Sequence, residues 1–515
     1  MQHESRLLEM LGALSLATDR GGGFPPETAL RTSIIGSRLA RAWGGDDQFV
    51  RDSQLACLLR YLGCTGSAHE AAALHAGDDQ GFLQLFADVD VGKPLELLSR
   101  APRLAPGAPM RQRVRTLAKL ADPRIANAIS LGHCEVACRL GAQIGANSEV
   151  VRALRQTYER FDGRGLPDRL RGNAVARVAR VMHAAQVFEV MLRSGGVAEV
   201  RAAVQRRARG QLDPELAQVI EREAGDIANS LVQPSLLGAL LADEPAPHAC
   251  VTADRRREVA LAFSLVGDLK STFTLGHSTR VAELAERCAG PLGVANRDDL
   301  RDAALLHDLG RVGISNALWE KPSALTFAER QRIEEHSWLT DQILRASPLL
   351  YPLSELTGVH ERLDGSGYHR RMRAVSVAPA ARLLAACDVY VALVSDRPQR
   401  RAHAKGMAAK ILGEEARAGR LDRDSVRVVL EVVGQPLPKL RGHAPAALSS
   451  REIDVLALLA KGRSNKDIAA RLHVAERTVK NHVANVYDKI GVRTRAGAAL
   501  FAVEHDLIDA GAFEN

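Results

Sequence analysis

The chain has 515 residues, of which 46% are hydrophobic and only 4% aromatic, so its cores are expected to be rich in Ala, Leu and Val. A net charge of +8 and a sequence pI near 9.2 favour a polyanionic partner. Seven scattered cysteines and the charged Glu4, Arg6 and Glu9 argue against a disulfide scaffold, a signal peptide and a membrane span. We therefore expect a cytoplasmic protein with no membrane partner.

Apolar residues recur with helical spacing nearly throughout the chain, which predicts an all-α fold. The length suggests three or four domains, and proline-rich stretches at 242–248 and 435–439 are typical of linkers. The expected organisation is two helical domains at 1–240 and 250–434, a linker at 435–446 and a small C-terminal domain at 447–515.

Three segments of the N-terminal half repeat patterns that return later in the chain. Residues 34–43 parallel 275–284, residues 51–63 parallel the stretch ending at Gly310, and residues 159–167 parallel 361–369. An internal repeat of this kind predicts two copies of one helical module.

The pair His307-Asp308 stands out in the second copy, in an otherwise apolar stretch that we expect to be a helix. A single His-Asp pair is usually a satisfied hydrogen bond. This pair, however, has further metal-type residues around it at domain-scale spacings, in apolar or turn-rich surroundings where an unpaired polar group would be costly. The set is His277, His307, Asp308, His336, His360 and Asp388. It predicts a hydrolytic site with two metal ions.

These residues and the blocks around them resemble the HD-GYP family of phosphohydrolases, helical enzymes that hydrolyse cyclic di-GMP. The blocks are 276–277, 307–314, 321–326, 333–336, 360–368, 387–390 and 395–398, within a match from about 275 to 402. The resemblance implies one metal held by His277, His307, Asp308 and Asp388, and a second held by Asp308, His336 and His360. The donor set suits Fe, Mn, Ni or Zn.

Three positions depart from the family pattern: Val359 replaces the first of two consecutive histidines, Arg311 a lysine, and His369 a proline. The change at Val359 removes one ligand of the second metal and leaves three, enough for an open catalytic site. Asp308 and Arg311 are the expected catalytic residues, because Arg311 is able to hold a substrate phosphate in a bidentate way.

A turn with two glycines follows His360 and is the expected substrate loop. Gly365 and Gly367 allow the backbone to approach a ligand closely, and Tyr368 completes the expected substrate contacts together with Arg311. Without the metal-type residues upstream, the same turn would be an ordinary surface turn.

The first copy retains one ligand-type residue, His133, at the position of His336. Elsewhere Arg60-Tyr61 replace His307-Asp308, Tyr158 replaces His360, and Gln186 replaces Asp388. One histidine does not hold a metal, so the first copy is expected to be inert, with a role as pseudo-dimer partner or ligand sensor.

The C-terminal segment predicts four helices: one from about 448 to Gly462, a short one at 465–472, a longer one at 476–490, and a last one after Thr494. A short and a longer helix joined by a tight turn form a helix-turn-helix. The segment from about 447 to 507 resembles the LuxR-type DNA-binding domain, carried by 464–469, 477–483 and 489–492.

This segment is strongly basic: residues 461–495 contain nine cations and three anions. Such a surplus favours contacts with DNA phosphates, so double-stranded DNA is the expected partner. The expected DNA-binding residues are Lys466, Arg477, Thr478, Lys480, Asn481, His482 and Lys489. In the LuxR family the last helix often dimerises, which implies a homodimer.

Three functions remain open. The chain is a DNA-binding regulator whose metal-dependent phosphodiesterase module hydrolyses cyclic di-GMP or a related nucleotide; or the module senses a nucleotide without turnover; or it acts on a different phosphorylated nucleotide. Val359 favours the sensor, and the six surviving ligands favour hydrolysis.

Overall fold

A computed structural model describes residues 6–90, 92–120, 122–436, 448–472 and 474–504. The described residues form helices joined by loops, with isolated bridges in place of β-strands, so the all-α prediction is confirmed. Among these residues, no helix combines the length and the apolar character that crossing a membrane requires.

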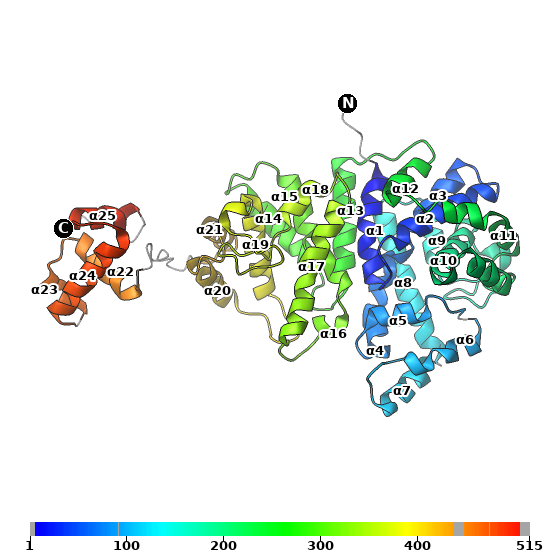
Figure 1. The fold of residues 1–515 in the computed structure, drawn as a ribbon, viewed down its shortest axis with the longest axis horizontal. Helices are drawn as coiled ribbons and strands as arrows, with labels where there is room; N and C mark the ends of the chain where they lie inside the picture. The colour runs from blue at the N-terminus through cyan, green and yellow to red at the C-terminus, as the bar shows by residue number, and fades with distance from the viewer. Residues whose placement is uncertain (1–5, 91, 121, 437–447, 473, 505–515) are drawn as a thin grey trace.

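The first repeat occupies one half of the main body (Figure 1). Its elements are α1 (Leu7–Gly21), α2 (Thr28–Ala42), α3 (Asp47–Leu59), η1 (Arg60–Ser67), α4 (Ala68–Leu74), α5 (Asp79–Phe86), α6 (Pro94–Ser99), η2 (Ala101–Arg103), α7 (Met110–Leu120), α8 (Pro123–Gln143), α9 (Ser148–Arg155), η3 (Gly172–Ala174), α10 (Arg177–Arg207), α11 (Pro214–Asn229) and α12 (Leu236–Asp243).

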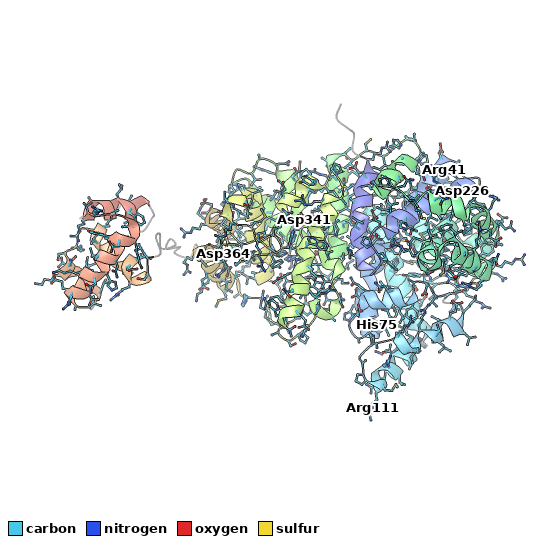
Figure 2. The ribbon with its side chains drawn as sticks, in the orientation of Figure 1. Arg41, His75, Arg111, Asp226, Asp341 and Asp364 are labelled. Atoms are coloured by element: carbon cyan, nitrogen blue, oxygen red, sulfur yellow. The ribbon has the colours of Figure 1, made fainter. Side chains whose placement is uncertain are left out.

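The second repeat follows with a similar order of elements. It comprises α13 (Ala253–Asp268), α14 (His277–Ala289), α15 (Arg297–Leu306), η4 (Leu309–Gly313), α16 (Asn316–Trp319), α17 (Phe327–Arg345), α18 (Tyr351–Leu356), η5 (Ala374–Ser376), α19 (Pro379–Leu393), α20 (Lys405–Arg417) and α21 (Arg423–Val432). The second repeat has the single turn α16 where the first repeat has an insert, α4–α7. The outer tip of this insert carries Arg111 (Figure 2).

Matching contacts show that the two halves are repeats. The Glu159 carboxylate accepts the backbone N–H groups nine and eleven residues further on, at 2.7 and 2.8 Å, and Glu361 does the same at the same distances. A side chain at Gly63 would collide with the carbonyl of His133, as one at Gly310 would with the carbonyl of His336. Each repeat therefore folds its η-helix against a long helix through a glycine.

One expected pairing is wrong. The apolar pattern pairs residues 34–43 with 275–284, but α2 and α14 begin alike at Thr28 and His277, each after a residue in the left-handed region. The first turn of each helix then donates a backbone N–H to a buried aspartate, Asp19 or Asp268. The equivalent of His277 is Thr28, because the helix start fixes the register and the shared apolar pattern does not.

The two repeats share one apolar core. Buried residues of both halves belong to a single continuous cluster, to which the two first helices contribute across the boundary. Helix α1 packs against η4 and α17 of the second repeat, and α13 packs against η1 and α8 of the first. The repeats are thus parts of one body.

The C-terminal helices have their own core. They are α22 (Ser450–Ala460), α23 (Asn465–Leu472), α24 (Glu476–Ile490) and α25 (Arg495–Glu504), packed around Leu456, Ile468 and Val479 among others. The predicted bounds of the two middle helices are confirmed. Residues 437–446 of the expected linker and 505–515 of the expected domain lie outside the described residues.

Candidate metal centre and nucleic-acid interface

The six predicted ligands come together in the second repeat, from five separate elements. His277 begins α14, His307 and Asp308 lie between α15 and η4, His336 is on α17, His360 follows α18, and Asp388 is on α19. All six side chains are buried. The expectation that His307-Asp308 lies within a helix is wrong: α15 ends at Leu306, and this helix end turns both side chains toward the other ligands.

Four of these residues form a first group, His277, His307, Asp308 and Asp388, whose ligand atoms all lie within 4.8 Å of one another. The Nε2 of His277 is 3.0 Å from Oδ1 of Asp388, and the Nε2 of His307 is 3.0 Å from Oδ2 of Asp308. Although this distance is short, the Nε2 of His307 is buried and makes no hydrogen bond within the described structure. Buried donor atoms that face one another in this way fit a cation between them.

A second group of three residues shares Asp308 with the first. The Nε2 atoms of His336 and His360 lie 2.8 Å apart, and each is 3.1 Å from Oδ1 of Asp308. The two oxygens of Asp308 therefore face different groups. A carboxylate in this position suits the bridge of a site with two metal ions.

Contacts of the Nδ1 atoms with backbone carbonyls orient two of the imidazoles. The Nδ1 of His307 lies 2.7 Å from the carbonyl of Ala304, and the Nδ1 of His336 lies 2.5 Å from the carbonyl of Ile333. Such contacts fix the tautomer and aim Nε2 into the cluster, as outer partners of metal-binding histidines do. The ring of Tyr368 stacks on His360, with centroids 5.0 Å apart and planes at 12°.

The charges of the cluster stabilise one another. Burial opposes ionisation of Asp308, yet Arg311 and the neighbouring imidazoles hold its pKa well below the ordinary value, and imidazoles do the same for Asp388. Burial also opposes the charged form of His307, but the carboxylates raise its pKa to about 10. Burial lowers the pKa of His360 to about 4. The carboxylates are thus ready to accept cations.

Two arginines lie beside the cluster. Arg311 pairs with Asp308 through one nitrogen, while its Nε and second terminal nitrogen are buried without a partner, and its guanidinium lies 5.4 Å from the ring centroid of Trp319. Burial lowers the pKa of Arg397 to about 10, and this charge is close enough to interact with Asp308 and Asp388. Arg397 was not among the expected site residues, although it lies in the matching block 395–398.

The glycine turn has structural roles of its own. Gly365 has a φ of +85°, and a side chain at Gly367 would come within 2.3 Å of the backbone nitrogen of Arg362. Both glycines are therefore required by the turn and its packing, and the expected contacts with substrate remain predictions.

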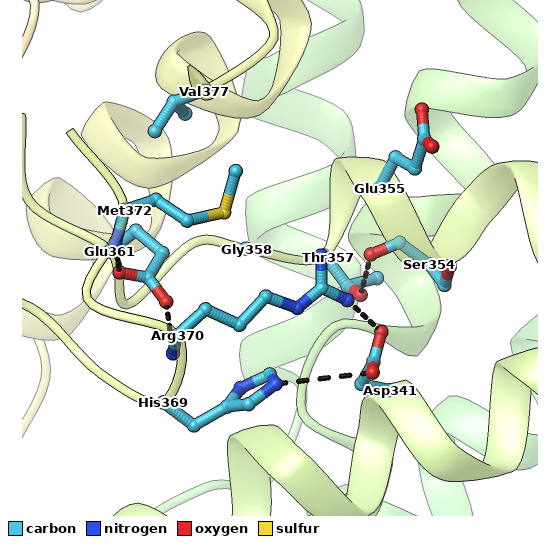
Figure 3. Close-up of a pocket in the computed structure, with 10 residues that line it drawn as sticks. All are labelled: Asp341, Ser354, Glu355, Thr357, Gly358, Glu361, His369, Arg370, Met372 and Val377. Atoms are coloured by element: carbon cyan, nitrogen blue, oxygen red, sulfur yellow. Dashed lines mark hydrogen bonds and ion pairs between the residues drawn. The ribbon is translucent and has the colours of Figure 1, made fainter. Parts of the chain in front are cut away.

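A small pocket lies behind this turn, and none of the six cluster residues lines it (Figure 3). Asp341 accepts hydrogen bonds from Arg370 and, at 2.9 Å, from Arg345, and lies 3.9 Å from His369. The Nδ1 of His369, where the family has proline, lies 3.1 Å from the hydroxyl of Ser337. This ion-pair network anchors the turn to α17.

The equivalent positions of the first repeat are Thr28, Arg60, Tyr61, His133, Tyr158 and Gln186, one ligand type among six. The Nε2 of His133 contacts the carbonyl of Arg60 at 3.1 Å, and burial lowers the His133 pKa to about 4. The groups of three or more metal-type residues found in the described chain lie in the second repeat.

The candidate nucleic-acid interface is the outer face of α24. Val479 and Val486 are buried, whereas Arg477, Lys480 and Asn481 are exposed. Thr478 and Lys466 are exposed as well, and His482 is half-buried. Lys489 differs from the others, since its ammonium is 2.7 Å from the carboxylate of Glu452, which also closes a capping box with Ser449 at the start of α22.

The pair Glu452–Lys489 should make the C-terminal domain sensitive to acid. The Lys489 hydrogen bond lowers the Glu452 pKa to about 2 from an ordinary 4.5, so the stabilisation is present above pH 4.5 and disappears toward pH 2. Glu452→Gln should lower the midpoint of thermal unfolding of this domain by about 4–8 °C at neutral pH. Calorimetry at several pH values should find that this difference shrinks on acidification; a difference independent of pH would contradict the assignment.

Family models match most of these regions. The model described as HD domain matches residues 128–216 and 266–425, and the model described as bacterial regulatory proteins, luxR family, matches 446–502. The match at 266–425 includes all six ligand positions of the second repeat. The match at 128–216 includes three of the six equivalent positions of the first repeat, namely His133, Tyr158 and Gln186.

Curated relatives cover both parts. The chain is 28% identical over 423 residues to 3'3'-cGAMP-specific phosphodiesterase 3 of Vibrio cholerae, which covers 80% of this chain and 92% of the relative. It is 32% identical over 146 residues to a cyclic di-GMP phosphodiesterase of Thermotoga maritima, 27% of this chain and 40% of the relative. Over 70 residues it is 41% identical to the response regulator protein VraR of Staphylococcus aureus, 14% of this chain and 34% of that protein.

A solved structure has the same fold. The crystal structure of a V. cholerae cyclic GMP-AMP-specific phosphodiesterase aligns with a TM-score of 0.59 at 24% identity, covering 84% of this chain and 99% of the other. The chain thus matches the HD domain model in both repeats and the bacterial regulatory luxR family model in its C-terminal domain, and over 80% of its length it is similar to a cGAMP-specific phosphodiesterase.

Proposed function

We propose that the second repeat hydrolyses a phosphodiester bond of a cyclic dinucleotide and that the C-terminal domain binds double-stranded DNA. The observation that carries the hydrolase is the position of Asp308, whose two oxygens face two ligand groups. Relatives named for 3'3'-cGAMP and cyclic di-GMP support this substrate class.

His277, His307, Asp308 and Asp388 would hold one divalent cation, and Asp308, His336 and His360 the other. Two such cations supply Lewis acidity and charge for the attacking and leaving oxygens. Fe, Mn, Ni and Zn suit this donor set.

The chain's own residues bind and orient the substrate. The unpartnered nitrogens of Arg311 are free to donate hydrogen bonds to a phosphate, and Trp319 holds the guanidinium from one side. Arg397 adds a second, half-buried positive charge that would compensate the substrate's phosphates. Tyr368, stacked on His360, fixes the direction of that ligand.

The exposed basic face of α24 would contact DNA phosphates and base edges in the major groove. We also propose a homodimer through α25, where Leu500 is 60% exposed and Val503 37%. Paired helices would present two recognition faces at a fixed separation.

A sensor without turnover is the second candidate, and Val359 favours it. This side chain is fully buried in the apolar core, where the family carries a further histidine. In the sensor, Arg311 and Arg397 would hold the nucleotide without cleavage.

Incubation of purified protein with Mn²⁺ and either cyclic di-GMP or 3'3'-cGAMP separates the two candidates. Hydrolysis should yield a linear dinucleotide resolved by ion-exchange chromatography. Binding of the cyclic nucleotide without a linear product would contradict the hydrolase and leave the sensor.

A further inference from the structure

The insert of the first repeat reaches the active-site loop of the second. Its helix α5 begins at Asp79, next to the segment that follows His307-Asp308, and ends at Phe86, next to the inert site of its own repeat. The described residues of the insert hold no group of metal-type side chains, yet both ends of α5 contact residues at or beside the two sites.

At its N-terminal end, α5 holds the backbone of residues 312–317. The Gln80 side-chain amide donates hydrogen bonds to the carbonyls of Val312 and of Arg20, both at 2.8 Å. The carbonyl of Gly77 accepts the N–H of Ala317 at 2.9 Å. Val312 directly follows Arg311, so the insert holds the chain one residue beyond the expected phosphate ligand.

A buried ion pair secures the same contact. Lys270, on the loop after α13, lies 2.5 Å from Asp79, and both side chains are 1% exposed. The other oxygen of Asp79 accepts the N–H of Asn316 at 3.1 Å. Burying two charges requires this close pairing, which makes the position of α5 specific.

At its other end, α5 leads into the inert site of the first repeat. Gln186, at the position of Asp388, donates a hydrogen bond to the carbonyl of Ala87 at 3.2 Å, and Arg207 donates one to the carbonyl of Asp88 at 2.5 Å. Arg160 pairs with the buried Asp90. Gln186, at the position of Asp388, and two nearby arginines thus bind the segment that follows α5.

We infer that the insert is a positioning element of the second repeat's active site, with Asp79 and Gln80 as positioning residues. The inert site fixes the C-terminal end of α5, and α5 in turn fixes the segment from η4, which carries Arg311, to the start of α16. This inference rests on the proposed hydrolase. The alternative is that α5 only fills space between the repeats.

Gln80→Ala tests the inference, with Gln84→Ala as the matched control. Gln84 lies one turn further along α5 and donates only to the carbonyl of Gly23, within the first repeat. With Mn²⁺ and the cyclic dinucleotide that wild type cleaves, Gln80→Ala should lower kcat about tenfold and change KM by less than about twofold, because the loop loses its alignment. Gln84→Ala should match wild type, and both variants should keep the wild-type unfolding midpoint to within about 2 °C.

Hydrogen exchange provides a readout that needs no turnover. Amides of residues 309–319 should exchange faster in Gln80→Ala than in Gln84→Ala, in full-length protein without nucleotide. Equal exchange and equal kcat in the two variants would overturn the inference. If wild type cleaves no cyclic dinucleotide, the proposed hydrolase fails, and faster exchange in Gln80→Ala alone would still support the contact.

A double variant, Asp79→Leu with Lys270→Met, removes the ion pair without leaving a single buried charge. It should stay folded, since Gln80 and the apolar core remain, and should lower kcat in the same direction as Gln80→Ala. A folded double variant with wild-type kcat and wild-type exchange at 309–319 would argue that α5 fills space only.

Discussion

Asp308→Asn should reduce hydrolysis roughly a thousandfold or more, because the carboxylate that the two proposed cations would share loses its charge, which removes several kcal/mol of transition-state stabilisation. The substitution keeps the shape of the side chain but weakens both ligand groups, since its two oxygens face one group each. Initial rates with Mn²⁺ and cyclic dinucleotide, together with metal analysis of the purified protein, provide the measurement.

Asp388→Asn makes the test sharper, because Asp388 belongs to the first group alone. Metal analysis should find the loss of one ion in Asp388→Asn and of both in Asp308→Asn. Asp298→Asn, on the exposed side of α15, is the control and should keep wild-type rates. Retained turnover in Asp308→Asn would contradict the assignment of the site, and DNA binding should be the same in all three variants.

Lys480→Glu should weaken binding to double-stranded DNA by one to two orders of magnitude at physiological salt. Lys480 is exposed on α24 beside Arg477 and Asn481, so the change turns an attraction to phosphate into a repulsion. The slope of log affinity against log salt should fall by about one for each recognition helix that loses a phosphate contact. Titration of a labelled duplex at several salt concentrations measures both quantities.

Lys410→Glu is the matched control for this variant. It changes net charge equally but lies on the exposed side of α20, outside the C-terminal helices. Equal losses of affinity in the two variants would indicate an effect of net charge alone and would remove α24 as the interface. Hydrolysis by Lys480→Glu should equal that of wild type.

Features that depend on local sequence patterns could be predicted from the sequence alone. The bounds of α23 and α24 followed from helical periodicity and end signals around Ser464 and Glu476. The residues of the metal cluster followed from residue types in ordered blocks, which a resemblance preserves even across 111 residues between His277 and Asp388.

Features that depend on packing between distant segments did not follow. The register of α2 depends on the hydrogen bond from Ala29 to Asp19, which periodicity does not reveal. The pairing of Lys270 with Asp79 joins residues 191 apart, and no local pattern predicts which buried cation meets which carboxylate. The end of α15 before His307 likewise depends on η4 packing against α17.

The continuous core has a consequence for how the inert copy is maintained. Because α1 and α13 each complete the other half's interior, a chain shortened to the second copy would expose apolar surface to water and tend to aggregate. The first copy carries one ligand type among six positions, yet its α1 still completes the interior of the second copy. A half without metal chemistry of its own is therefore still required as a structural scaffold for the other half.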